Sequence, residues 1–185
     1  MCELYRDIFD DSFLDKFGKY KDKVGNIKLT TNAIDVIEIC KVCSISLASI
    51  NSFDSGRCIN DNTKSQIEYS SFEPEYRQRF TIAHELGHIM LGHEGISYRT
   101  EDQQKYKDVI EKAKETLANR FAADLLMPKV LVIKYLRNAF KYYNLDLNEA
   151  IGKIDYDLVL RYTAKKLNVS IPALSYRIKH LELIK

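Results

Sequence analysis

Residues 83–94 read AHELGHIMLGHE and place His84 and His88 four residues apart, with Glu85 directly after the first histidine. Because an α-helix advances about 100° per residue, the two imidazoles lie within about 40° of each other, one turn apart. Two imidazoles stacked in this way can both reach one metal ion at about 2.0–2.1 Å. Glu85 points about 60° to the side of His88, where it can contact a water held by the metal. The stretch therefore predicts a helix with two metal ligands and a candidate catalytic base.

The apolar residues around the histidines fall on the opposite face of the same helix. That face consists of Ile82, Leu86, Ile89 and Met90. It can pack into the core while the histidines line a cleft, which is the arrangement that a metal site needs. The alternative is an ordinary amphipathic helix whose two histidines are hydrogen-bonded at the surface. The position of the apolar stripe, away from both histidines, favours the metal site.

A catalytic zinc usually takes three protein ligands and one water, so a third ligand must come from another part of the chain. His93 follows His88 by five residues and, on a continued helix, would point about 140° away from it. The long zincin motif places a glycine three residues, and its third histidine six residues, after the second histidine. This chain matches neither spacing. His93 is therefore better suited to supporting a metal ligand, to the substrate side of a site, or to no role, than to metal binding itself.

Residues 111–128, EKAKETLANRFAADLLMP, offer carboxylates on a second helix. Glu115 and Asn119 share one face of that helix, and Glu111 lies one turn earlier on the same side. Either glutamate could complete a His2Glu ligand set if this helix faces the histidine helix. Asn119 could then hydrogen-bond the outer nitrogen of a ligand histidine and fix its tautomer. The alternative is an exposed charged stripe, opposite a core-facing side that we expect to consist of Leu117, Phe121 and Leu125.

Two segments, in this order along the chain, form a specific combination. They are RQRFTIAHELGHIMLGH, residues 77–93, and ETLANRFAADLLMP, residues 115–128. Together they resemble the ImmA/IrrE metallopeptidases, gluzincin-like proteins of bacteria, phages and integrative elements, and the resemblance is clear over about residues 30–130. It implies that His84, His88 and Glu115 hold one zinc ion with a bound water, and that Glu85 is the catalytic glutamate. Family members often have a second acidic residue where this chain has Leu117, which implies that this position is not needed as a ligand.

The resemblance also implies a function. It indicates an endopeptidase that cleaves a helix-turn-helix transcriptional repressor and so relieves repression, in a stress response or during induction of a mobile element. A different class of function stays open: a non-proteolytic regulator that binds a repressor or DNA while it keeps the metal fold. For the enzyme, His93, Tyr98 and Arg99 are candidates to stabilise the oxyanion, and nothing in the sequence selects among them. The strand QIEYS, residues 66–70, could hold an extended peptide by strand addition.

The rest of the chain predicts an α+β fold. We expect a helix over 4–20, a second helix capped by Thr31, and a small antiparallel three-stranded sheet from SISLASI and the hairpin strands RCIN and QIEYSS on either side of the turn DNTK. This sheet packs on a zincin-like helical core with helices over 76–91, 103–126 and from 129 after Pro128. We expect a metallopeptidase domain over 1–150 and a helix-turn-helix-like tail over 151–185, packed on the same core and divided at NVSIP.

The tail is basic. From Arg161 onward it contains one acidic residue, Glu182, against the basic residues Arg161, Lys165, Lys166, Arg177, Lys179 and Lys185. Such a balance could engage nucleic-acid phosphates. It is equally typical of a solvated helix pair that docks on the protease core, and we favour this structural role over DNA contact.

Composition and charge limit the remaining possibilities. With 185 residues and 45% hydrophobic residues, the chain can form one good core, and its net charge of +2 neither requires nor excludes an anionic partner. Its first residues have no apolar stretch of the signal-peptide type, and it has no apolar run near 18 residues, so we expect a cytoplasmic protein without a membrane span. Its four cysteines are then reduced thiols, with Cys40 and Cys43 buried on the apolar face of the second helix.

Overall fold

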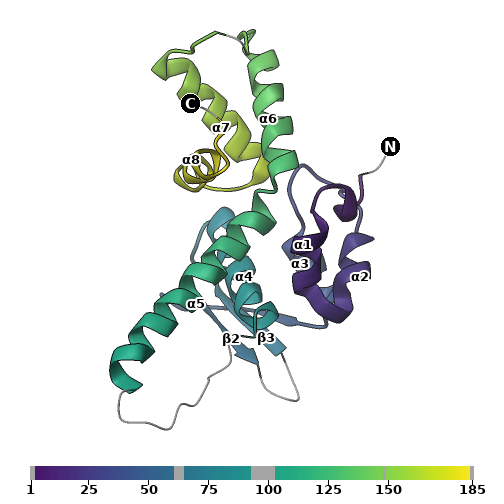
Figure 1. The fold of residues 1–185 in the computed structure, drawn as a ribbon, viewed down its shortest axis with the longest axis vertical. Helices are drawn as coiled ribbons and strands as arrows, with labels where there is room; N and C mark the ends of the chain where they lie inside the picture. The colour runs from purple at the N-terminus through teal and green to yellow at the C-terminus, as the bar shows by residue number, and fades with distance from the viewer. Residues whose placement is uncertain (1–2, 61–64, 93–102, 148, 184–185) are drawn as a thin grey trace.

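The computed structural model describes residues 3–60, 65–92, 103–147 and 149–183. The described part of the chain combines helices with one small sheet, so the predicted α+β class is confirmed (Figure 1). In chain order the elements are η1 (Tyr5–Asp7), α1 (Asp11–Leu14), η2 (Asp15–Tyr20), α2 (Lys21–Gly25), α3 (Val36–Val42), β1 (Ser46–Ile50), β2 (Gly56–Asn60), β3 (Ser65–Ser70), α4 (Glu75–Met90), α5 (Gln103–Leu126), α6 (Lys129–Tyr142), α7 (Lys153–Leu167) and α8 (Ile171–His180).

The N-terminal segment forms several short helices, and the predicted continuous helix over 4–20 is wrong. Asp10 begins a new helix because its side chain accepts a hydrogen bond of 2.8 Å from the Phe13 amide. Gly18 then interrupts the chain with φ 51° and ψ −122°, a conformation that glycine adopts at little cost. The apolar spacing was nevertheless informative, because Phe13 and Phe17 are buried and both rings contact Phe121 of α5.

Helix α3 begins at Val36, with Asp35 rather than Thr31 as its N-cap. One Asp35 carboxylate oxygen accepts hydrogen bonds of 3.0 Å from the amides of Ile37 and Glu38. The Thr31 hydroxyl instead donates to the Ala33 carbonyl at 2.8 Å, within the loop that precedes the helix. The predicted cap at Thr31 is therefore wrong, because both residue types cap helices and only tertiary structure decides between them.

The sheet has the strand order β1-β3-β2 and is mixed. Strands β2 and β3 pair in antiparallel fashion, with Cys58 opposite Ile67, as the predicted hairpin requires. Strand β1 pairs with β3 in parallel, with Leu47 opposite Ile67, so the prediction of a purely antiparallel sheet is wrong. The chain reverses direction twice between β1 and β3, and β3 lies in the middle of the sheet; two strands of the same direction thereby become neighbours. Residue alternation predicts strands but not their order.

Helix α4 lies at the centre of the fold, where it contacts the sheet through β2 and β3 and also packs against α5 (Figure 1). Its buried side chains include Ile82 and Leu86, the apolar face expected from the sequence. These join one core with Ile67 of the sheet and with Phe121 of α5. The opposite side of α4 is thereby left to line a cleft.

The C-terminal helices extend the same core. Helix α7 ends at Asn168 with φ 51°, and α8 begins after Ser170, whose hydroxyl accepts from the Ala173 amide at 3.2 Å. The predicted division of the tail at NVSIP is therefore confirmed. Helix α6 packs against α7, and α7 against α8. None of the described helices combines the length and the apolar character that crossing a bilayer requires.

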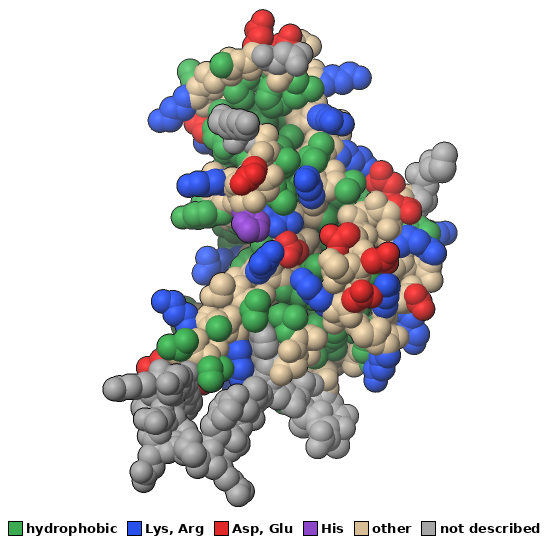
Figure 2. Space-filling view, viewed as in Figure 1, with side chains coloured by type: hydrophobic (Ala, Val, Ile, Leu, Met, Phe, Trp, Pro, Cys, Tyr) green, Lys and Arg blue, Asp and Glu red, His purple; other side chains and the backbone are tan. Residues whose placement is uncertain are grey.

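Arg177 of α8 is buried, with 7% of its surface exposed. Its guanidinium donates to the Asp124 carboxylate at 2.6 Å and to the Met127 carbonyl at 2.9 Å, both at the end of α5. Arg177, one of the basic residues that could have contacted phosphates, is therefore bound to the end of α5 instead. On the face shown in Figure 2, lysine and arginine side chains are scattered over the molecule with acidic side chains among them. That distribution is typical of a solvated surface.

Candidate metal centre

Helix α4 places His84 and His88 one turn apart on the side that faces α5. Their Nε2 atoms lie 3.1 Å apart, and their ring centroids 4.8 Å apart. Both side chains are only 16% exposed. Burial, and secondly the neighbouring His84, lower the pKa of His88, so its neutral form is favoured. A neutral imidazole is the form that binds a metal ion.

Helix α5 brings Glu115 against both rings. One carboxylate oxygen lies 3.2 Å from Nε2 of His84, and the other lies 3.2 Å from Nε2 of His88. One ligand atom from each of the three residues lies within 4.8 Å of the others. Glu111, the rival in the sequence, does not belong to this group of described residues. The two helices thus bring together the three side chains that the sequence resemblance implied.

The arrangement fits a tetrahedral metal ion. Ligand atoms at about 2.05 Å from a tetrahedral centre lie about 3.3 Å apart, and the observed separations are 3.1–3.2 Å. Neutral imidazole nitrogens and carboxylate oxygens that face one another without a proton repel each other, and a cation among them removes that repulsion. A set of two imidazoles and one carboxylate is the donor set of several catalytic zinc sites.

Asn119, one turn after Glu115 on α5, holds the outer side of His84. Nδ1 of His84 lies 3.0 Å from Oδ1 of Asn119. Because an amide oxygen only accepts hydrogen bonds, Nδ1 is the protonated nitrogen, and the neutral ring presents the lone pair of Nε2 to Glu115 and His88. This is the supporting contact that orients metal-binding histidines in proteins.

Gly87 explains why α4 and α5 approach so closely. A Cβ atom at this position would lie 3.1 Å from Phe121 Cδ1 and 3.3 Å from the Cα of Ala118. Glycine in a helix interior costs about 1 kcal/mol relative to alanine. At this position, however, the absence of a Cβ lets the α5 backbone come near enough for Glu115 to reach the histidines. The sequence interpretation gave Gly87 no role, although a glycine within a helix is a signal of close packing.

Glu85 and Cys58 lie together beside the three candidate ligands. Glu85 lines the same cleft as His84 and Glu115. The Cys58 thiol, on β2, lies beside the Glu85 carboxylate; burial foremost, and then this carboxylate, raise the pKa of Cys58 to about 12. The thiol is therefore protonated at neutral pH and can donate a hydrogen bond to the candidate base. The sequence interpretation did not connect Cys58 with the site, because strand order was not known.

The other predicted residues have different outcomes. Leu117 is 49% exposed and does not belong to the core-facing side of α5, whereas Phe121 and Leu125 are buried as expected. His93, Tyr98 and Arg99, the candidates for oxyanion stabilisation and for a further role at the substrate side, lie outside the described residues.

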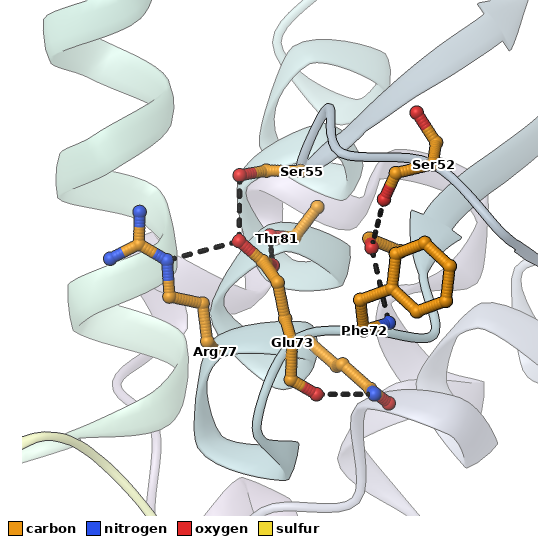
Figure 3. A network of polar contacts seen from close by, with 8 residues as sticks. Ser52, Ser55, Phe72, Glu73, Arg77 and Thr81 are labelled. Carbon is orange, nitrogen blue, oxygen red and sulfur yellow. Dashed lines mark hydrogen bonds and ion pairs between the residues drawn. The ribbon is translucent and has the colours of Figure 1, made fainter.

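The site opens into a cleft of about 630 Å³. Near one wall, a polar network fixes the start of strand β2 on α4 (Figure 3). Glu73 accepts hydrogen bonds from Ser55 at 2.8 Å, from Arg77 at 3.1 Å and from Thr81 at 3.5 Å. A Cβ atom at Gly56 would overlap the side chain of Thr81. Because glycine lacks this atom, β2 can pack tightly against the helix that presents the histidines.

Comparison with known proteins agrees with this geometry. The family model of the IrrE N-terminal-like domain matches residues 41–179. The radiation response metalloprotease IrrE of Deinococcus radiodurans is 41% identical over 68 residues, which are 36% of this chain and 20% of that protein. The IrrE of Deinococcus deserti is 44% identical over 64 residues, 34% of this chain and 22% of that protein. The matches thus span about one fifth of the length of these relatives. The chain belongs to the family of the IrrE N-terminal-like domain, a peptidase family.

Proposed function

We propose that this protein is a zinc-dependent endopeptidase. The observation that supports the proposal most directly is the convergence of His84, His88 and Glu115 within hydrogen-bonding distance of one another, with Glu85 in the same cleft. Two imidazoles and a carboxylate would hold one zinc ion and leave a position for water. A zinc ion at such a site supplies a Lewis acid, which polarises a carbonyl group and lowers the pKa of water.

Glu85 is the proposed general base. Its carboxylate removes a proton from the attacking water and passes that proton to the amine that leaves when the peptide bond breaks. The protonated Cys58 thiol beside this carboxylate would help to orient it within the cleft. Asn119 holds the His84 ring in the orientation and tautomer that zinc binding requires.

Strand β2 is the proposed platform for the substrate backbone. The sequence favoured QIEYS for this role, but that segment lies in β3, which is paired on both sides with β1 and β2. Strand β2 lies at an edge of the described sheet and contacts α4, and its first residue, Gly56, lines the cleft together with the preceding Ser55. An extended peptide added to β2 would place its backbone across Glu85.

We further propose that the substrate is a helix-turn-helix transcriptional repressor, whose cleavage relieves repression in a stress response or during mobile-element induction. This rests on the resemblance to the ImmA/IrrE metallopeptidases and on membership of the family. The reaction is placed in the cytoplasm, in keeping with the free thiols of Cys40, Cys43 and Cys58. The partner is therefore a protein, and DNA contact has no part in the proposal.

The test uses purified protein loaded with zinc and a candidate repressor, for instance one encoded beside it in the genome. We expect wild type to cut the repressor into defined fragments and Glu85→Gln to bind zinc but produce no fragments. Glu111→Gln, an exposed change one turn before Glu115, is the matched control and should cleave normally. Full cleavage by Glu85→Gln would contradict the assigned base. If wild type and Glu85→Gln both bind the repressor tightly and leave it intact, the result would instead favour a non-proteolytic regulator.

A further inference from the structure

The cleft continues beyond the candidate metal centre. It runs from His84 and Glu115 along α4 to a wall made by the end of α5 and by the turn between α7 and α8. Phe80 lies one turn before His84, and the two ring centroids are 6.3 Å apart. Phe80 therefore lies between the metal-binding end of the cleft and the wall at its other end, which we call the second wall.

The second wall is apolar. It consists of Leu126, Met127, Val169, Pro172 and Ala173, together with the small polar residue Ser170. Leu126 and Met127 are almost completely buried and form a floor, while Val169 and Ala173 are partly buried. The hydroxyl of Ser170 accepts the hydrogen bond from the amide of Ala173 and so serves the start of α8. None of the described residues that the end of α5 and the α7–α8 turn contribute to the cleft is charged.

Contacts on two sides fix this wall in place. Arg177 of α8 binds Asp124 at 2.6 Å and the carbonyl of Met127 at 2.9 Å, which holds α8 on the end of α5. The amide of Asn168, in the turn between α7 and α8, donates to the carboxylate of Glu75 at 2.6 Å, which holds the turn against the start of α4. The apolar wall is thus formed before any substrate binds, as is usual for a pocket that selects ligands.

The charged residues of the cleft lie elsewhere. Arg77 is paired with Glu73, whereas Glu85 and Glu115 belong to the candidate metal centre. A charged substrate group that reached the α7–α8 wall would lose water without gaining a partner, which is unfavourable. An apolar side chain would gain free energy by leaving water at the same place.

We propose that the wall formed by Leu126, Met127, Val169, Pro172 and Ala173 is a specificity subsite, which takes an apolar side chain of the substrate several residues away from the bond that is cleaved. This deepens the proposed peptidase function and rests on it. The cleft volume of about 630 Å³ exceeds that of one side chain, so the backbone on either side of the bound residue fits as well. The C-terminal helices then have a role in substrate selection in addition to their packing on the core.

The first test inserts a charge into the wall. Ala173 occupies the third helical position after the cap Ser170, where glutamate completes a capping box, so Ala173→Glu adds a carboxylate without weakening the start of α8. The matched control is Tyr176→Glu, on the same helix, where the side chain is 78% exposed and does not line the cleft. Ala173→Leu is a second variant, which reduces the space without adding charge.

Cleavage preferences are measured with a proteome-derived peptide library, and the cut sites are identified by mass spectrometry. We expect wild type and Tyr176→Glu to select large apolar residues at one position several residues away from the cut. Ala173→Glu should lose about tenfold in cleavage of such peptides and shift toward lysine or arginine there. Ala173→Leu should shift toward smaller apolar residues. An unchanged preference in both Ala173 variants, with zinc still bound, would overturn the subsite but leave the peptidase function standing.

A binding measurement keeps the subsite testable if no peptide is cut. In the Glu85→Gln background loaded with zinc, fluorescence anisotropy compares a labelled decapeptide of alanine and serine with a central leucine against the same peptide with a central glutamate. We expect the leucine peptide to bind about tenfold more tightly, and Ala173→Glu to abolish that difference. Equal binding of the two peptides would contradict the subsite. If the subsite distinguishes the peptides but wild type cleaves neither the library nor the repressor, the proposed peptidase function fails and the binding site stands.

Discussion

Gly87 of α4 lies directly against Ala118 of α5, so closely that a Cβ at position 87 would be 3.3 Å from the Cα of Ala118. The same contact brings Glu115, three residues before Ala118, to both histidines. The spacing of the two helices and the spacing of the candidate ligands are therefore one structural feature. A change in the distance between the two helices should therefore alter the distances between the candidate ligands.

We expect Gly87→Val to weaken zinc binding. Its branched side chain must separate α4 from α5, because Phe121 and the Ala118 backbone occupy the space. Overpacking of this kind costs about 1–3 kcal/mol. Competition with a fluorescent chelator measures zinc affinity, and circular dichroism shows that the chain is folded. Gly152→Val is the control, since a Cβ at Gly152 would make only an ordinary contact of 3.8 Å with Asp155, and its zinc affinity should equal that of wild type. Equal affinity in both variants would contradict the link between helix spacing and the site.

Asn119→Ala should reduce zinc affinity about 10–100-fold, because the His84 ring loses the acceptor at 3.0 Å that fixes its tautomer. Asn138→Ala on α6 removes an exposed amide outside the cleft and serves as the control. Isothermal titration with zinc gives both constants. An Asn119→Ala affinity within a factor of about two of wild type would show that the His84 contact has no role in metal binding.

The helices around the site could be predicted from the sequence, whereas the sheet could be predicted only in part. Apolar periodicity located α4 and α5 because each buries one continuous stripe, and Pro128 marked the end of α5. The hairpin of β2 and β3 followed from the polar turn between two alternating segments. The parallel pairing of β1 with β3 depends on strand order, which alternation does not contain. The sequence consequently favoured QIEYS as a peptide-binding strand, although it lies in β3, the central strand of the described sheet.

The site itself could be predicted in two steps of different strength. Helical geometry placed His84 and His88 on one side of a helix, but it left Glu111 as a rival of Glu115. Only the resemblance to a family selected Glu115, which is the glutamate that the structure brings to the histidines. Cys58 could not be connected with Glu85, because the two residues are neighbours only through the packing of β2 on α4.

The ion pair between the buried Arg177 and the partly buried Asp124 should contribute measurably to stability. Arg177→Ala removes two charge-assisted hydrogen bonds, to Asp124 and to the Met127 carbonyl. We expect it to lower the free energy of unfolding by about 2–3 kcal/mol. Lys179→Ala, an exposed basic residue two positions away, should change that free energy by less than about 0.5 kcal/mol. Urea denaturation measures both values, and equal effects would show that the buried pair contributes nothing particular.

The thiols of Cys40 and Cys43 should resist alkylation in the folded protein. Burial raises the pKa of Cys40 to about 12 and that of Cys43 to about 11, so the reactive thiolate is scarce at pH 8. Iodoacetamide labelling followed by mass spectrometry should modify both only after unfolding in urea. Because these pKa values are raised in the folded state, the stability that they contribute is complete below about pH 8.5 and declines as the pH rises further. Rapid labelling of the native chain at pH 8 would contradict this burial.

The central claim is that His84, His88 and Glu115 hold one zinc ion together. The most direct measurement is the zinc content and zinc affinity of wild type, Glu115→Gln and Glu111→Gln after identical purification, by mass spectrometry of the metal and by chelator competition. We expect one tightly bound zinc per chain in wild type and in Glu111→Gln, and an affinity lower by at least about a hundredfold in Glu115→Gln. The account would be contradicted if Glu115→Gln bound one zinc per chain with wild-type affinity. It would also be contradicted if zinc binding were lost only in Glu111→Gln.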